Sequence, residues 1–177
     1  MKDSLAEILK GAASLDEELR SRMRFHLTGV KQAVVDEILT EQEKTRLQDV
    51  LIVHKWMQYE ELVALYQQVH YLFFARPVNR MTLSNFPSKV PEALTYGVVP
   101  VVSRVGDYTA YYLKDGVDSL IFDGDSGEVC RQALVRALSV APEDYVAMSQ
   151  RARLTAENRF DYHNWQKEIK DSIESMF

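Results

Sequence analysis

The stretch NFPSKVPEALTYGVVPVV, residues 85–102, joins a stiff polar turn to a short helix and then to a buried strand. Two prolines and a lysine stand directly ahead of Glu92, and a glycine follows the helical pattern at about residues 89–96. The valine-rich run at 99–104 comes next, and a compact apolar run of this kind indicates a strand that is buried on both faces. A helix that leads directly into such a strand is typical of α/β proteins.

The same alternation of helix and strand runs along the whole chain. Compact apolar runs predict strands at 24–30, 50–56, 70–76, 99–104 and 119–123. Helical patterns cover residues 3–20, 32–48, 59–69, 89–96, 108–116, 126–141, 142–157 and 164–177. We therefore expect one α/β domain over residues 1–177, with a doubly wound, Rossmann-like parallel sheet of about five strands and helices on both faces. Ligands of such sheets bind at the carboxyl ends of the strands, where the stretch at 85–102 lies.

Composition and charge narrow the class of protein. Of the 177 residues, 46% are hydrophobic and 27% are charged, as in a folded domain. The net charge of −5 comes without a basic stripe, so we expect no nucleic-acid partner. The longest apolar runs are far shorter than the roughly 20 residues that cross a bilayer, and the acidic N-terminus does not resemble a signal peptide. The single cysteine, Cys130, fits a buried thiol in a cytoplasmic protein.

The turn at 85–88 has the chemistry of an anion site. Ser88 is a good N-cap residue, and Pro91 falls in the first helical turn, where its missing N–H costs nothing. The amides of Lys89 and Val90 should then be free to face an anion such as a diphosphate, and Lys89 adds a full positive charge. The carboxylate of Glu92 can accept two hydrogen bonds from a ribose diol. The alternative is that Glu92 only complements the helix dipole.

The order of motifs resembles the carboxy-terminal, donor-binding domain of retaining glycosyltransferases with the GT-B architecture, the group 1 or GT4 family. That family has two glutamates eight positions apart around a Gly-Phe-Pro-Asn type turn, and the second glutamate falls on Glu92. The further matches are the turn at 85–88, the helix at 93–97, the strand at 100–102, Gly106, the turn at 115–116, and Phe160 and Trp165 in the closing RFDYHNWQKEI. The resemblance covers nearly the whole chain.

What the resemblance implies is a site for a nucleotide-sugar donor, UDP- or GDP-linked with a hexose-type sugar, that needs no bound metal. In the family the second glutamate holds the ribose hydroxyls, and helix amides with basic side chains hold the diphosphate. The implied donor-binding residues of this chain are Lys2, Ser84, Asn85, Phe86, Ser88, Lys89 and Glu92. Base contacts are implied at Trp56 and Met57, and no catalytic residue is implied.

The chain departs from the family's pattern in three places. Ser84 stands where the first glutamate would address the sugar, which bears on sugar handling. The family's first, central strand is not found ahead of Asp3, so we expect the strand at 24–30 to lie beside the strand at 70–76 or to leave a gap. The amino-terminal domain, which binds the acceptor and offers a route to peripheral membrane contact, is also absent from the sequence. We therefore expect this chain alone to be inactive.

Two other interpretations stay open at this point. A non-catalytic module that keeps a glycosyltransferase-like fold for protein interaction fits Ser84 and the short N-terminus. A receiver-like or flavodoxin-like domain has the same alternation, but the sequence has no acidic cluster or phosphate loop to support it.

Two groups of side chains have more than one role open to them. Tyr108, Tyr111 and Tyr112 fit either core packing or a docking surface, and solvent exposure separates the two. The histidines lack ligand-like spacing and fit packing or surface roles rather than a metal site; they are His26, His54, His70 and His163.

Overall fold

Five short parallel strands form the framework of the fold, and they lie in two separate sheets. The computed structural model describes residues 3–176. One sheet pairs β1 (Phe25–Leu27) with β2 (Leu51–Val53), and the other has the order β3 (Tyr71–Phe74), β4 (Val99–Ser103) and β5 (Leu120–Phe122). Every strand lies inside a segment that the sequence predicts as a strand.

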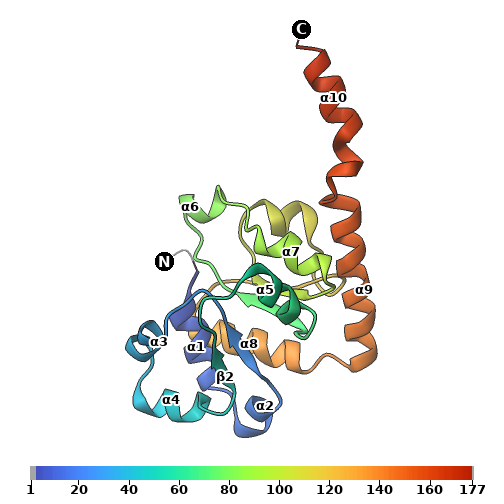
Figure 1. Ribbon diagram of the computed structural model, residues 1–177. Helices are drawn as coiled ribbons and strands as arrows, with labels where there is room; N and C mark the ends of the chain where they lie inside the picture. The colour runs from blue at the N-terminus through green and yellow to red at the C-terminus, as the bar shows by residue number, and fades with distance from the viewer. Residues whose placement is uncertain (1–2, 177) are drawn as a thin grey trace.

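The described chain also contains ten α-helices and two helical turns of other types. The α-helices are α1 (Leu5–Ala13), α2 (Glu17–Ser21), α3 (Gln32–Ile38), α4 (Glu41–Leu47), α5 (Tyr59–Tyr66), α6 (Arg80–Leu83), α7 (Lys89–Thr95), α8 (Gly127–Leu138), α9 (Pro142–Arg159) and α10 (Gln166–Glu174). The turns are the π-helical η1 (Tyr108–Tyr112) and the 3-10 helical η2 (Tyr162–Trp165). Figure 1 shows β3 to β5 between α7 and α8, with α1 to α4 gathered beside β2.

Three of the predicted helices were wrong in extent. The single helix expected at 3–20 is two helices, because Asp16 caps a new helix by accepting a hydrogen bond from the Leu19 amide at 2.8 Å. The helix expected at 32–48 also divides, since Leu39 is extended and Thr40 begins α4 with a capping box. The helix expected at 108–116 shrinks to one π-helical turn, which the Leu113 amide closes on the Tyr108 carbonyl at 3.0 Å.

Strand β4 is the centre of the core, and all five of its residues are buried. Its alternate side chains enter different clusters: Val101 packs in a cluster with Ala133 of α8, whereas Val102 packs in one with Leu94 of α7. Because neighbouring strand residues point to opposite faces, helices cover this sheet on both sides. The expected doubly wound, Rossmann-like α/β class is therefore confirmed for the β3–β5 sheet, while the five strands do not form one continuous sheet.

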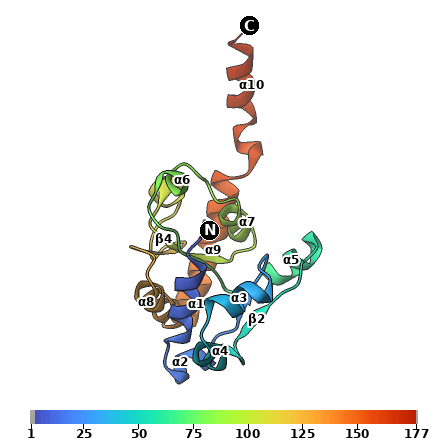
Figure 2. The same ribbon diagram turned by 90° about the vertical axis from the view of Figure 1, so that its left-hand side faces the viewer.

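The two sheets meet along a seam between β1 and β3. Within residues 3–176 no hydrogen-bonded ladder joins these two strands. Side chains make the connection instead, and the rings of Phe25 and Phe73 lie 6.5 Å apart between centroids. Helix α1 packs against both α8 and α4, so it also joins the two parts of the fold (Figure 2).

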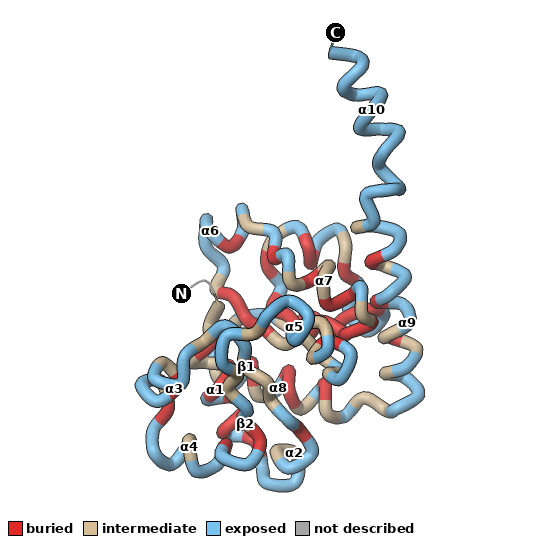
Figure 3. Tube along the Cα trace, in the orientation of Figure 1, coloured by how far each residue is buried: buried red, intermediate tan, exposed pale blue. Residues whose placement is uncertain are grey.

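Helix α10 projects from the body of the protein in both views (Figures 1 and 2). All of its residues are exposed, as the pale blue of Figure 3 shows. They include Ile169 and Ile173, which are more than half exposed and, four residues apart, share one face of the helix. No helix within the described residues is long and apolar enough to cross a membrane.

Candidate functional site

Arg76 is the buried charge at the carboxyl end of β3. Its side chain is only 4% exposed. Its backbone amide donates a 2.8 Å hydrogen bond to Ser103 Oγ, and the same hydroxyl donates to the Arg76 carbonyl at 3.2 Å. Since Ser103 ends β4, these two bonds hold Arg76 at the edge where neighbouring parallel strands end. This is the edge at which ligands of α/β sheets bind.

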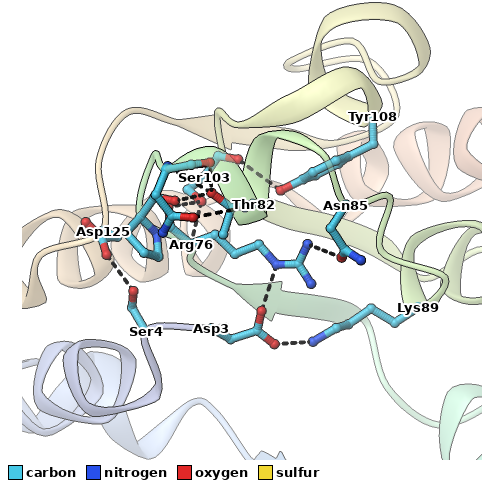
Figure 4. Close-up of polar contacts among 11 residues, drawn as sticks. Asp3, Ser4, Arg76, Thr82, Asn85, Lys89, Ser103, Tyr108 and Asp125 are labelled. Carbon is cyan, nitrogen blue, oxygen red and sulfur yellow. Dashed lines mark hydrogen bonds and ion pairs between the residues drawn. The ribbon is translucent and has the colours of Figure 1, made fainter. Parts of the chain in front are cut away.

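Asp3 brings Arg76 and Lys89 together, as Figure 4 shows. One carboxylate oxygen of Asp3 accepts a hydrogen bond from Arg76 Nε at 2.7 Å, and the other accepts from Lys89 Nζ at 2.6 Å. Both cations also lie over the ring of Phe74, Arg76 at 5.2 Å and Lys89 at 4.7 Å from its centroid. Two positive charges from different elements therefore converge on one anion.

The pKa of Asp3 is shifted in the direction that this pairing favours. Burial alone would raise the pKa, but hydrogen bonds and charge from Lys89 and Arg76 outweigh it and lower the pKa below 3.8. The carboxylate is therefore ionised near neutral pH. The site favours an anion at this position strongly enough to overcome the cost of partial burial.

The residues predicted in the turn surround this pair unevenly. Asn85 accepts a 3.1 Å hydrogen bond from Arg76 Nη1 through its side-chain oxygen, so it belongs to the cluster. Phe86 packs edge-on against Tyr108, Tyr112 and Phe160, which makes it a support of the turn. Ser84 is exposed and donates to the Arg80 carbonyl at 2.8 Å, at the end of α6.

The expectation that the Val90 amide is free was wrong. Ser88 has helical backbone angles and makes no capping hydrogen bond through its side chain. The Val90 amide instead donates to the Pro87 carbonyl at 3.0 Å, because the chain already turns as a helix at Ser88. Of the two amides expected to face an anion, that of Val90 is therefore occupied by the turn itself, and the turn also presents the positive charge of Lys89.

Glu92 follows Lys89 in the first turn of α7 and lies next to a stacked pair of tyrosines. Its Oε2 accepts a hydrogen bond from the hydroxyl of Tyr66 at 3.3 Å. Tyr66 stacks on Tyr96 with ring centroids 5.6 Å apart, which fixes its orientation. Burial, followed by the charge of Glu92, raises the pKa of Tyr66, so its hydroxyl stays a donor.

Some predicted residues lie outside this cluster. Trp56 is 83% exposed in the segment between β2 and α5, next to the half-buried Met57. Among residues 3–176, no hydrogen bond or aromatic contact connects either of them to Lys89 or Glu92. Lys2 lies outside the described residues.

The structure places the tyrosines of the segment 108–112 and the histidines, whose roles the sequence left open. Tyr108 is fully buried, which makes it core, while Tyr111 is 75% exposed on the same turn. His26 Nδ1 and His54 Nε2 lie 2.9 Å apart as a hydrogen-bonded pair between β1 and the end of β2. Within the described part of the chain, no group of three or more histidine, cysteine or acidic residues could hold a metal ion.

Sequence reasoning missed Arg76, Asp3 and Tyr66. Arg76 carried a signal, since it directly follows the apolar run YLFFA at the end of a predicted strand. Asp3 and Tyr66 carried none, because their partners lie 73 to 86 and 26 residues away in the chain. A contact of that kind appears only when the chain has folded.

A family model described as glycosyl transferases group 1 matches residues 2–155. The chain belongs to this family. The match confirms the resemblance on which the sequence interpretation rests, at the level of group 1; the finer GT4 assignment stays a prediction. No curated protein matches the chain.

Solved glycosyltransferase structures share the fold. HepE of Anabaena in complex with UDP-glucose is 15% identical with a TM-score of 0.69, over 96% of this chain and 44% of that one. A glycosyltransferase from Rickettsia africae is 12% identical with a TM-score of 0.72, over 97% and 44%. Sucrose-phosphate synthase from Thermosynechococcus elongatus is 16% identical with a TM-score of 0.66, over 97% and 42%. The chain thus spans less than half of the length of these proteins.

Proposed function

We propose that this chain is the donor-binding domain of a glycosyltransferase that transfers a hexose-type sugar from a UDP- or GDP-linked donor. The observation that carries the proposal is the placement of Lys89 and Glu92 in the first turn of α7, where Lys89 shares the carboxylate of Asp3 with the buried guanidinium of Arg76, in a group 1 glycosyltransferase chain. The binding of UDP-glucose by HepE, which has the same fold, supports a nucleotide-sugar ligand.

Each residue of the proposed site has a distinct task. Lys89 neutralises the diphosphate, and the carboxylate of Glu92 accepts hydrogen bonds from the ribose diol. Tyr66 holds one oxygen of Glu92, which leaves the carboxylate in a defined orientation. Asn85 positions Arg76 through their hydrogen bond.

The remaining predicted residues belong to the proposal on sequence grounds. Ser84, Phe86 and Ser88 are proposed as further donor-binding residues, Lys2 as an added cation for the diphosphate, and Trp56 with Met57 as contacts of the base. We assign no catalytic residue and propose that basic side chains, without a metal, neutralise the leaving diphosphate.

A second domain completes the proposed enzyme. We propose that an acceptor-binding domain supplies the other side of the cleft and any peripheral membrane contact. We also propose that a further strand belongs between β1 and β3, whose facing edges share no ladder in the described residues. A cytoplasmic location remains part of the proposal, on the sequence argument from Cys130.

Calorimetric titration with UDP and GDP tests the nucleotide site. Glu92→Gln keeps the shape of the side chain but removes the charge that receives the ribose hydroxyls. A hydrogen bond to a charged group contributes about 1.5–3 kcal/mol, so we expect the dissociation constant of the bound nucleotide to rise roughly tenfold to a hundredfold. The same substitution should change the affinity for the 2′-deoxy nucleotide much less, because that ligand lacks the diol.

Glu60→Gln is the matched control, since Glu60 is an exposed glutamate in the first turn of a neighbouring helix. It should leave nucleotide binding unchanged. If neither nucleotide binds at millimolar concentration, or if Glu92→Gln weakens both forms of the nucleotide equally, the proposed role of the site is wrong.

The alternative function, a non-catalytic interaction module, has one observation in its favour. Helix α10 presents Ile169 and Ile173 to solvent on one face, and Trp165 just before it is also exposed. An amphipathic helix that projects from the body suits a protein contact. Failure of nucleotide binding together with intact folding would favour this module over the enzyme.

A further inference from the structure

We propose that Arg76 and Lys89 act as one anion-binding pair for the donor's diphosphate, and that the carboxylate of Asp3 fills this pair until the diphosphate displaces it. This inference rests on the proposed function and adds both a binding residue, Arg76, and an internal competitor, Asp3. The chain would then hold its own phosphate position closed in the absence of donor.

The geometry of the pair suits a diphosphate. Arg76 comes from the end of β3 and Lys89 from the start of α7, and both direct their donors at a single carboxylate, at 2.7 and 2.6 Å. A carboxylate and a phosphoryl group both present two oxygens to such donors. Because the Arg76 side chain is only 4% exposed, an anion that contacts it is poorly screened by water.

Arg76 is fixed in place without Asp3. Its backbone is tied to Ser103 by two hydrogen bonds, its Nη1 donates to Asn85, and its guanidinium lies over Phe74. A buried guanidinium with this support is pre-organised for an anion. Removal of the Asp3 carboxylate should therefore leave a site that still has its shape.

Asp3 can leave the pair without unfolding α1. The helix start is held by other groups: the Ser4 amide donates to the Ala75 carbonyl at 2.9 Å, and the Ser4 hydroxyl donates to Asp125. The Asp3 side chain itself is 28% exposed, so solvent reaches it. A change of side-chain rotamer is enough to release the two cations to a ligand of higher charge.

The decisive experiment compares Asp3→Asn with the native 177-residue chain in calorimetric titrations with UDP, inorganic pyrophosphate and uridine. We expect Asp3→Asn to bind UDP and pyrophosphate about tenfold more tightly, equivalent to about 1.4 kcal/mol, because the competing charge is gone. The affinity for uridine, which has no phosphate, should not change. Asp16→Asn is the matched control, since it makes the same charge change at the N-cap of α2, where asparagine also caps helices well.

Lys89→Met keeps the test decisive if Asp3→Asn fails to fold. The Lys89 side chain is 36% exposed, and its loss leaves the bond between Asp3 and Arg76. We expect this variant to lose pyrophosphate binding at least tenfold, and unchanged pyrophosphate binding would overturn the pair.

The outcomes separate this inference from the proposed function. If UDP binds the native chain but Asp3→Asn binds UDP and pyrophosphate no better, the competitor is refuted while the nucleotide site stands. If pyrophosphate binding improves in Asp3→Asn but UDP binds neither protein, the anion pair stands and the nucleotide site fails. Weaker binding of both ligands to a folded Asp3→Asn chain would mean that Asp3 only positions the cations, and it would also refute the competitor.

Discussion

Replacement of Gly11 by alanine should destabilise the protein, although alanine is the better helix former. Gly11 lies in α1 where this helix crosses α8. A Cβ atom at this position would lie 2.8 Å from the Gly127 carbonyl oxygen, 2.9 Å from the Arg131 amide nitrogen and 2.9 Å from Cys130 Cβ. Two of these three neighbours are backbone atoms of the α8 segment, which cannot rotate away. The helices would have to separate by several tenths of an ångström.

Two opposing terms set the size of the effect. Alanine in place of glycine inside a helix gains about 1 kcal/mol. Overpacking of a tight contact costs typically about 1–3 kcal/mol, and contact with rigid backbone puts this case in the upper part of that range. The separation would also loosen Leu9 and Ala12, both fully buried in α1. We expect a net loss of about 1–2 kcal/mol in the free energy of unfolding.

Urea unfolding followed by circular dichroism measures this difference directly. For a chain of this size, each kcal/mol also lowers the melting temperature by about 2–4 °C, which gives a second readout. Lys10→Ala, at the neighbouring exposed position, is the control and should stay within about 0.5 kcal/mol of the native chain. A Gly11→Ala protein that is as stable as the native chain would refute the close contact between α1 and α8.

Three further predictions test other parts of the fold. Thr155→Val should lower stability by about 1–3 kcal/mol in urea unfolding, because it removes the 2.7 Å hydrogen bond to the buried carboxylate of Asp118, whereas Thr155→Ser should not. Burial raises the pKa of Cys130 to about 12, so its thiol should react with a thiol reagent only after denaturant is added; fast reaction in native buffer would contradict this. Burial, and then the charge of His54, lowers the pKa of His26 below 6.5 in the folded protein. As the pH falls, His26 is therefore protonated in the unfolded chain before it is protonated in the folded one. The free energy of unfolding should then decrease as the pH drops below about 6.5. Nuclear magnetic resonance titration of His26 checks this, and an apparent pKa above 6.5 would show the sign to be wrong.

Local sequence patterns were sufficient to find the strands and the class of fold. Every predicted strand segment contains a strand, because a short apolar run between polar turns is buried most readily as a strand inside the domain. The strands are shorter than predicted, since the apolar pattern continues past the last ladder hydrogen bond. Trp56 shows this: it ends the run VLIVHKW, but β2 stops at Val53 and Trp56 is exposed.

Helix breaks were missed where the apolar periodicity continues through a cap. Leu15 and Leu19 maintain the helical spacing across the break before α2, yet the side chain of Asp16 starts a new helix between them. The signal was present in the sequence, since Asp16 is followed by two glutamates that suit a first helical turn.

The candidate site was predictable only where its residues are local. Lys89 and Glu92 are three residues apart on one helix, so their proximity follows from helical geometry. The contact between Asp3 and Arg76 spans 73 positions and depends on how α1 meets the end of β3. The occupied Val90 amide could not be predicted from the sequence, because it depends on the backbone angles of Ser88.

The seam between the two sheets determines which distance within the proposed site can change most easily. The proposed phosphate position lies after β3, whereas Trp56, proposed to address the base, follows β2 on the other side of the seam. Distances within each sheet are held by backbone ladders, but in the described residues the seam is crossed by side-chain packing such as that of Phe25 on Phe73. Side-chain packing yields to small shifts more readily than a ladder does. For this chain on its own, without the further strand proposed between β1 and β3, we therefore expect the choice between a pyrimidine and a purine nucleotide to be made in the span from phosphate to base, and not at Lys89 or Glu92.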